Sequence, residues 1–333
     1  MLSLFGEASL FQTAVRRLEG VFPPERILVV TVREQAPDLQ SQAPQIPAQN
    51  YLIEPLPRGT ASVVGLAAVA LQNRDPQAVM AILTSDHYIG NEDRFRHLLS
   101  TAELVARDDF LVTLGIEPTF AATGYGYIHK GQPLDSYNGM DVFRVARFTE
   151  KPDEETARRF LESGEHSWNS GMFVWQVNSI LAEFERQMPS LFVSLQEIAS
   201  AWGSASQRDV IQRVWPELKS ETIDYGIMEG ARRVAVIPAS GLEWSDVGSW
   251  DSLFDLLEGD EQGNIVMGGS HIGLDTQDTL VYVEEEPRLI VTIGVQELVV
   301  VATGDVLLVC HKDQAQRVRQ VVNHLKENDR NYI

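Results

Sequence analysis

The stretch AVMAILTSDHYIGNEDRFRHLLSTAELVARDDFLVTLGI, residues 78–116, decides the fold class. Its two ends, 78–85 and 110–116, are short, apolar and rich in β-branched residues, a pattern typical of strands covered on both faces. Between them, residues 91–109 carry apolar side chains at helical spacing. A strand, a helix and a strand in this order predict a right-handed crossover in an α/β protein with a Rossmann-like, mostly parallel sheet.

The rest of the chain divides into two parts by the same criterion. The alternation continues with expected strands at 26–32, 141–148 and 171–177 and expected helices at 60–72 and 153–164. After about residue 260, short strands follow one another without helices until a final helix from 313 to about 327. We therefore predict an α/β domain over residues 1–260 and a small β-rich domain over 261–333 that ends in a helix.

The composition narrows the class of partner. The 333 residues include 47 acidic and 27 basic side chains, which give a formal net charge of −20. A surface of this sign repels phosphate backbones and anionic lipids, so we expect neither nucleic acid nor membrane as a partner. A phosphate substrate would need a metal ion to offset the field. The single Cys310 and the lack of an apolar run of roughly 18 residues predict a cytoplasmic protein.

Polar residues follow the strand at 78–85. At the end of this strand lie Ser85, Asp86 and His87. In open α/β sheets, ligands bind beyond the carboxyl ends of the strands. Asp86 is a hard oxygen ligand, and Mg²⁺ usually binds one or two protein carboxylates of this kind. The alternative is that Asp86 caps the next segment while His87 packs as a structural residue. Asp246, in the turn EWSDVGSW at 243–250, offers a second carboxylate or another capping residue.

Four further loops combine glycine or proline with polar groups. In NYLIEPLPRGTASVVG, residues 50–65, prolines hold the chain extended and Thr60 opens a helix whose first amides favour an anion. The loops at 122–128, 148–152 and 168–175 place glycine or proline near polar side chains that could bind sugar hydroxyls or phosphate. Each of these loops also fits an ordinary turn.

Taken in order, these motifs resemble the sugar-phosphate nucleotidyltransferases, and among them the mannose-1-phosphate guanylyltransferases. The resemblance is carried by Glu54-Pro55, Arg58-Gly59-Thr60-Ala61, Ser85-Asp86-His87, Thr123-Gly124-Tyr125-Gly126-Tyr127, Glu150-Lys151-Pro152, Asn169-Ser170-Gly171, TIDYGIME at 222–229 and WSDVGSW at 244–250. Relatives that use thymidine or uridine triphosphates lack the Arg-Gly-Thr-Ala run, so the resemblance favours guanine.

One part of the family pattern is missing at the start of the sequence. The family begins with a strand and a Gly-Gly-x-Gly-x-Arg loop followed by Pro-Lys-Gln, whereas this sequence starts at MLSLFGEASLFQ, which matches the family's segment directly after Pro-Lys-Gln. Either the chain is truncated at its N-terminus or it is a relative that has lost catalysis. We favour truncation because the other motifs are intact and because a sheet without its first strand would expose an apolar edge or gap.

The resemblance implies that GMP is transferred from GTP to mannose 1-phosphate, which gives GDP-mannose and pyrophosphate. Asp86 and Asp246 would hold Mg²⁺, and Lys151 would bind the sugar phosphate; these three form the implied catalytic set. Glu54 would read guanine, and the nucleotide site would also include Arg58, Gly59 and Thr60, which could instead hold the ribose, the phosphate or their own loop. The implied sugar site consists of Gly124, Tyr125, Glu150, Asn169 and Asp224.

Two other functions stay open at this point. A regulator that binds nucleotide sugars without catalysis would keep the sugar loops and lose the triphosphate loop. A pyrophosphorylase for another sugar phosphate or another base would keep the same carboxylates. A homodimer is one candidate assembly.

Overall fold

A computed structural model describes residues 8–284 and 288–328. The chain forms two units. The large unit comprises Phe11–Ser85 and Ile89–Trp244, and the small unit comprises Asp86–Tyr88, the described residues from Ser245 onward and those before Phe11. The first seven residues, on which part of our interpretation of the chain's start rests, lie outside the described residues.

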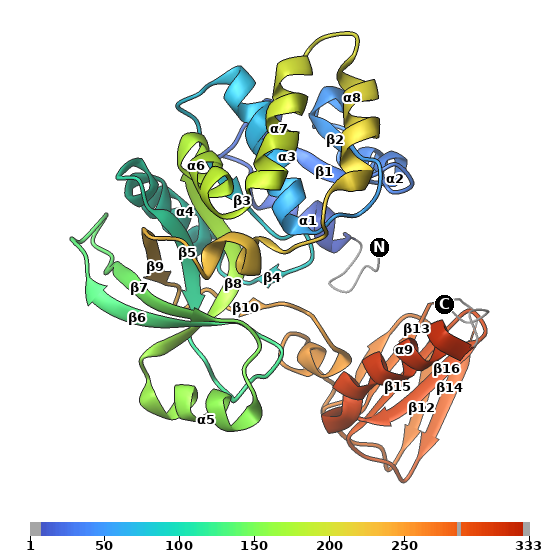
Figure 1. The fold of residues 1–333 in the computed structure, drawn as a ribbon. Coiled ribbons are helices and arrows are strands. Elements are labelled where there is room, and N and C mark those ends of the chain that lie inside the picture. Colours follow the sequence, from blue (N-terminus) through green and yellow to red (C-terminus); the bar gives the residue numbers. More distant parts are fainter. Residues whose placement is uncertain (1–7, 285–287, 329–333) are drawn as a thin grey trace. The chain divides into compact units, whose positions relative to one another are not determined.

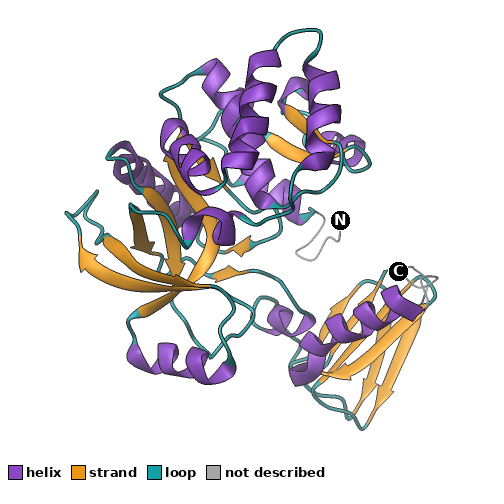
Figure 2. Ribbon diagram, viewed as in Figure 1, coloured by secondary structure: helices purple, strands orange, loops and turns teal. Residues whose placement is uncertain are grey.

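The elements up to residue 245 alternate between helices and strands, as Figures 1 and 2 show. The helices are α1 (Leu10–Arg16), α2 (Ala36–Gln42), α3 (Thr60–Arg74), α4 (Glu92–Arg107), α5 (Glu154–Ser163), α6 (Val177–Gln187), α7 (Pro189–Ala201) and α8 (Gln207–Val214). The strands are β1 (Val29–Val32), β2 (Tyr51–Glu54), β3 (Val79–Ile82), β4 (Tyr88–Ile89), β5 (Leu111–Ile116), β6 (Tyr127–Pro133), β7 (Phe143–Thr149), β8 (His166–Gln176), β9 (Val234–Pro238) and β10 (Trp244–Ser245).

The α/β class is confirmed, but the prediction of a mostly parallel sheet is wrong for the part of the chain described. The six-stranded sheet has the order β3-β8-β5-β9-β7-β6. Only its β5–β9 pair is parallel, since β8 runs antiparallel to β3, β5 and β6, and β7 runs antiparallel to β6 and β9. Strands β3 and β5, which flank α4, are not neighbours, because β8 lies between them. Parallel strands β1 and β2 form a separate sheet.

Helices cover both faces of the six-stranded sheet. Helix α4 packs against β3, β5, β8 and β9, while α3 and α6 pack on the sheet from the other side and join α7. The alternation of side chains along β5 explains this arrangement: Leu111 enters the cluster below α3 and α6, and Val112 enters the cluster below α4. Apolar cores on both faces fix the sheet as a rigid support for the loops that leave its strands.

The ends of the helices follow local capping rules. In α4, the Asn91 side chain accepts a hydrogen bond from the Arg94 amide at 3.0 Å. In α5, Asp153 accepts from the Thr156 amide at 2.8 Å, and Gly164 ends the helix in the left-handed conformation. These caps explain why the expected helix at 153–164 is confirmed almost to the residue.

The small unit is built from short strands, as expected. It contains β11 (Ile265–Met267), β12 (Ser270–Leu274), β13 (Leu280–Val283), β14 (Leu289–Ile293), β15 (Leu298–Thr303), β16 (Val306–His311) and α9 (Val318–Asn328). Strands β11, β13 and β15 pair in parallel, and so do β12 and β14. Leu280 and Val299 stack within its core. Within residues 8–284 and 288–328, no helix has the length and apolar character to span a membrane.

An aromatic stack joins α5 to the sheet. His166 of β8 lies between Phe160 of α5 and His129 of β6, with ring centroids 4.0 Å and 4.7 Å away. Burial, followed by the nearby His129, lowers the pKa of His166 to about 4. The folded protein therefore keeps this imidazole neutral at pH values where the unfolded chain protonates it.

We expect His166 to make folding sensitive to acid. Its contribution is fully present above pH 6.5, the ordinary pKa, and is lost as the pH falls toward 4, because the unfolded chain then binds more protons. His166→Phe keeps an aromatic ring in the stack and should flatten the loss of unfolding free energy in that window, measured by denaturant titration. The same change at exposed His97 of α4 serves as the control. An unaltered pH profile for His166→Phe would contradict this prediction.

Candidate active site

A bulge in β8 shapes the centre of the large unit. Thr113 of β5 lies opposite Phe173, but Gly115 lies opposite Asn169, so β8 uses four residue steps where β5 uses two. Gly171 lies within the bulge with φ of 69°, a conformation that favours glycine. Bulges of this kind change the direction of a neighbouring side chain.

The side chain of Asn169 is held by three partners. Its Oδ1 accepts hydrogen bonds from the Thr113 hydroxyl and from the Gly171 amide, both at 3.2 Å. Its Nδ2 donates to Asp224 Oδ1 at 2.8 Å. The amide is thus fixed between the sheet and the π-helical turn Asp224–Met228.

Glu150 and Lys151 lie beside this group. Lys151 Nζ donates to Glu150 Oε1 at 2.7 Å, and this hydrogen bond is the main cause that raises the pKa of Lys151. Lys151 itself has φ of 45°, an uncommon conformation for a residue with a side chain. A Cβ atom at Gly126 would overlap Glu150 Oε2, so the absence of a side chain there makes room for this carboxylate.

Asp224 completes the cluster. Burial and the nearby Glu150 carboxylate raise its pKa, while the hydrogen bond from Asn169 and the charge of Lys151 act in the opposite direction. Four predicted site residues from three distant segments, Glu150, Lys151, Asn169 and Asp224, therefore interact with one another. We call these four residues the polar cluster.

Tyr125 lies among aromatic rings rather than in the polar cluster. Its ring makes edge contacts with Trp168 and Trp244, with centroids 5.0 Å and 5.8 Å away. Gly124 next to it has open space where a Cβ would lie. Because Trp168 and Asn169 are neighbours in β8, the aromatic rings and the polar cluster are joined through the same strand.

Glu54 ends β2 and is buried, with an exposed fraction of 7%. The Arg58 amide and the Trp215 side chain interact with its carboxyl group, but burial is the larger influence and raises its pKa. Its Oε2 atom is buried and has no hydrogen-bond partner among the described residues. An unpaired buried carboxyl oxygen is costly, and a ligand that supplies a donor would remove the cost.

The residues after Glu54 bind the protein itself. Arg58 donates to the Pro216 carbonyl, and Thr60 Oγ1 accepts from the Ile223 amide at 2.9 Å. Gly59 has φ of 79°, and a Cβ there would overlap the backbone of Glu221. Both side chains thus contact residues of a distant segment of the chain, Pro216 and Ile223. These contacts tie the loop to the segment that carries Asp224.

Asp86 and Asp246 belong to the small unit. Asp86 is largely exposed, and its Oδ1 lies 3.9 Å from His87 Nε2. Asp246 Oδ1 accepts from the Gly248 amide at 3.1 Å within the turn, whereas the helical turn Trp250–Phe254 has Ser249 at its N-cap and no side-chain cap. Strands β4 and β10, which adjoin these two residues in the chain, pair with each other. No set of three or more His, Cys, Asp or Glu residues in the described part of the chain is arranged to hold a metal.

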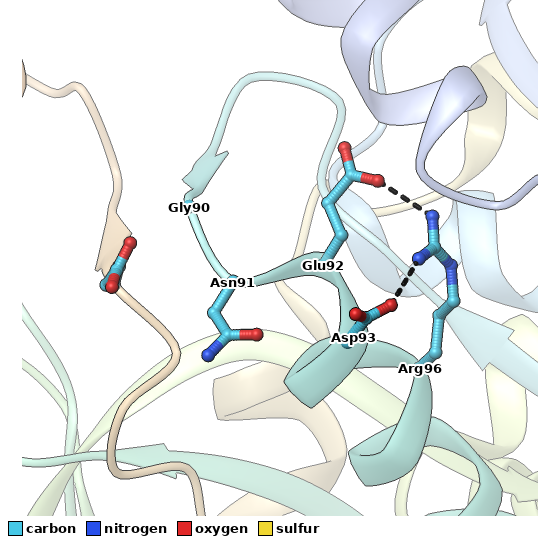
Figure 3. Close-up of a pocket in the computed structure, with 6 residues that line it drawn as sticks. Gly90, Asn91, Glu92, Asp93 and Arg96 are labelled. Atoms are coloured by element: carbon cyan, nitrogen blue, oxygen red, sulfur yellow. Dashed lines mark hydrogen bonds and ion pairs between the residues drawn. The ribbon is translucent and has the colours of Figure 1, made fainter.

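A cavity of about 460 Å³ opens at the start of α4 (Figure 3). It is lined by Gly90, Asn91, Glu92, Asp93, Arg96 and Glu243. None of the predicted site residues lines it. Arg96 is already paired with Glu92 at 2.7 Å and with Asp93 at 2.9 Å, so its charge is neutralised by its own helix.

Sequence reasoning missed several residues that hold the site. Thr113 lies in an apolar strand where threonine is ordinary, and Glu221 precedes the motif at 222–229. Trp168 and Gly126 were within quoted motifs but received no role. Tyr225 is exposed by 48% and lies close enough to Lys151 to influence its pKa. Tyr225, Trp168 and Gly126 carried a signal, because each lies in a segment that the sequence analysis singles out.

Comparisons with known proteins agree on the class of protein. The family model described as nucleotidyl transferase matches residues 1–263, and the model for the MannoseP isomerase/GMP-like beta-helix domain matches residues 269–325. A solved structure from Thermus thermophilus, described as mannose-1-phosphate geranyltransferase, has a TM-score of 0.83 and 34% identity over 97% of this chain and 90% of that one. The fold of the chain is that of a nucleotidyltransferase.

Curated relatives narrow the class. A mannose-1-phosphate guanylyltransferase of Salmonella muenchen is 39% identical over 99% of this chain and 69% of its own length. One from Klebsiella pneumoniae is 34% identical with the same coverage. The chain belongs to the mannose-1-phosphate guanylyltransferase family.

We predict that Gly59 is required for the loop that contacts Glu221. Gly20 has nearly the same φ, 81°, but open space around its Cβ position, so Gly20→Ala measures the backbone cost alone, about 1–2 kcal/mol. Gly59→Ala should lower the unfolding free energy by clearly more, because the backbone of Glu221 must also move. Denaturant titration of both variants measures the difference. Equal losses would show that the contact with Glu221 does not restrict this position.

Proposed function

We propose that this protein transfers GMP from GTP to mannose 1-phosphate and releases pyrophosphate. The observation that carries the proposal is the polar cluster, in which one lysine lies among two carboxyl groups and an amide. A phosphorylated sugar needs a cation for its phosphate and hydrogen-bond partners for its hydroxyls, and the cluster offers both. Family membership over almost the whole chain supports the reaction type.

Lys151 would bind the phosphate of mannose 1-phosphate. Its side chain is exposed by about half, and its ammonium group keeps its charge because the hydrogen bond to Glu150 raises its pKa. Glu150 Oε2 would accept hydrogen bonds from sugar hydroxyls, and Asn169 would donate to the sugar. Positioning of two anions accounts for most of the catalysis expected here.

Glu54 would read the guanine base. An ionised carboxylate only accepts hydrogen bonds, and guanine presents two adjacent donors, N1–H and the N2 amino group. The unpaired Oε2 of Glu54 is an acceptor that such a base would satisfy. Arg58 and Thr60 would support this residue by fixing the loop, because their side chains are engaged with Pro216 and Ile223.

The reaction forms one bond and breaks one bond. A phosphate oxygen of mannose 1-phosphate attacks the α-phosphorus of GTP, and the bond from that phosphorus to the oxygen bridging to the β-phosphorus breaks. The bonding electrons leave with pyrophosphate. Because mannose 1-phosphate attacks the α-phosphorus directly, no covalent intermediate with the protein is needed. The protein's residues bind and orient the two substrates.

Asp86 and Asp246 would hold Mg²⁺. The donor set fits this ion, since two carboxylates suffice when water and substrate phosphates complete the octahedron. Asp86 contributes an exposed carboxylate, and Asp246 contributes a carboxylate whose Oδ1 is fixed by the Gly248 amide. When bound, the ion would neutralise phosphate charge in a protein whose net charge is −20.

The direct test is product formation by the 333-residue chain. With GTP, mannose 1-phosphate and Mg²⁺, we expect GDP-mannose and pyrophosphate, and we expect EDTA to abolish both. A panel with glucose 1-phosphate and with ATP, UTP or dTTP should give much lower kcat/KM. Faster turnover of another pair would identify a different pyrophosphorylase. Tight binding of GDP-mannose without any turnover would identify a regulator.

Glu54→Gln tests the reading of guanine. Inosine triphosphate lacks the N2 amino group, so the parent chain should favour GTP by about 1–3 kcal/mol in kcat/KM. In the variant, the amide NH₂ faces one of the guanine donors, so this preference should shrink while the KM for mannose 1-phosphate changes little. If Glu54 only fixes its loop, both nucleotides would weaken alike and the ratio would stay constant.

A further inference from the structure

Thr113 carries a hydroxyl group in the middle of an apolar strand. Every residue of β5 is buried, and Thr113 has no exposed surface at all. A hydroxyl buried in this way is costly unless it forms a hydrogen bond. Its Oγ1 donates to Asn169 Oδ1 at 3.2 Å, across the bulge in β8.

The partners of Asn169 determine which way its amide points. Oδ1 accepts from both Thr113 and the Gly171 amide, while Nδ2 faces the carboxyl group of Asp224. A reversed amide would bring Nδ2 against the Gly171 N–H and Oδ1 against the Asp224 oxygen, which pairs donor with donor and acceptor with acceptor. The observed orientation leaves the second Nδ2 hydrogen without a protein partner among the described residues, and a ligand can accept it.

We propose that Thr113 is a positioning residue for the sugar phosphate subsite, which acts by holding the Asn169 amide so that it presents a donor to the ligand. The inference rests on the proposed function, because it takes mannose 1-phosphate as the ligand of the polar cluster. Thr113 contacts no substrate itself. Its hydroxyl fills the second acceptor site of Asn169 Oδ1 and thereby limits rotation of the side chain.

Thr113→Val removes the hydroxyl and keeps the β-branched shape. For the full chain we expect the Kd and KM of mannose 1-phosphate to rise about fivefold to tenfold, as loss of one partner of a buried hydrogen bond implies. The KM of GTP should change by less than about twofold, because Thr113 does not touch the proposed nucleotide site. Thr113→Ser keeps the hydroxyl and should restore the parent Kd.

Thr101 provides a matched control. It is also fully buried, and its hydroxyl donates to the His97 carbonyl within α4, away from the polar cluster. Thr101→Val should leave the Kd of mannose 1-phosphate unchanged, measured by calorimetry. If Thr113→Val does not fold, Thr113→Ser and Thr113→Ala still differ only by the hydroxyl group and allow the same comparison.

The outcomes separate the two proposals. Normal binding by the parent chain with an unchanged Kd in Thr113→Val would overturn the positioning role alone. An equal rise for GTP and for mannose 1-phosphate would also overturn it, because it would indicate a general structural effect. Absence of mannose 1-phosphate binding by the parent chain would overturn the proposed function and this inference together.

Discussion

The bulge in β8 is the constraint on which the candidate site depends. Residues 173–176 of this strand pair with β3, and 173–174 also pair with β5, whereas the register of Asn169 is shifted by two residues relative to β5. Gly171 lowers the energetic cost of this shift, because glycine has no Cβ atom and adopts a φ of 69° without steric strain. The same glycine donates its amide to Asn169, so the break in the strand pairing and the orientation of the amide have one cause.

The charges of Glu150, Lys151 and Asp224 explain why the polar cluster combines a lysine with two carboxyl groups. Two carboxyl groups close together repel, and burial together with this repulsion raises the pKa of Asp224. Lys151 counters the repulsion through its 2.7 Å contact with Glu150. The strained backbone of Lys151 is consistent with a residue whose side chain direction matters more than local stability. In a protein of net charge −20, the Lys151 ammonium group is a local positive charge that attracts an anionic ligand.

The sequence predicted the elements of the fold better than their pairing. Periodicity and capping residues identify α5 and most strands because these signals are local. The insertion of β8 between β3 and β5 could not be predicted, since strand order is decided by contacts between distant residues. Within the site, Glu150, Lys151, Asn169 and Asp224 were found through motif order. Thr113 was missed, because the sequence does not distinguish a threonine whose hydroxyl forms a specific hydrogen bond from one that only favours β structure.

Glu54 and the loop that follows it differ in how far the protein itself uses their hydrogen-bonding groups. A side chain whose hydrogen-bonding groups are used by the protein has less to offer a ligand, and Arg58 and Thr60 are used in this way by Pro216 and Ile223. Glu54 keeps one buried oxygen without a partner among the described residues. The loop around this oxygen is closely packed, because Gly59 lies directly against the backbone of Glu221. Close contacts of the neighbouring residues thus accompany a buried carboxyl oxygen that has no partner among the described residues.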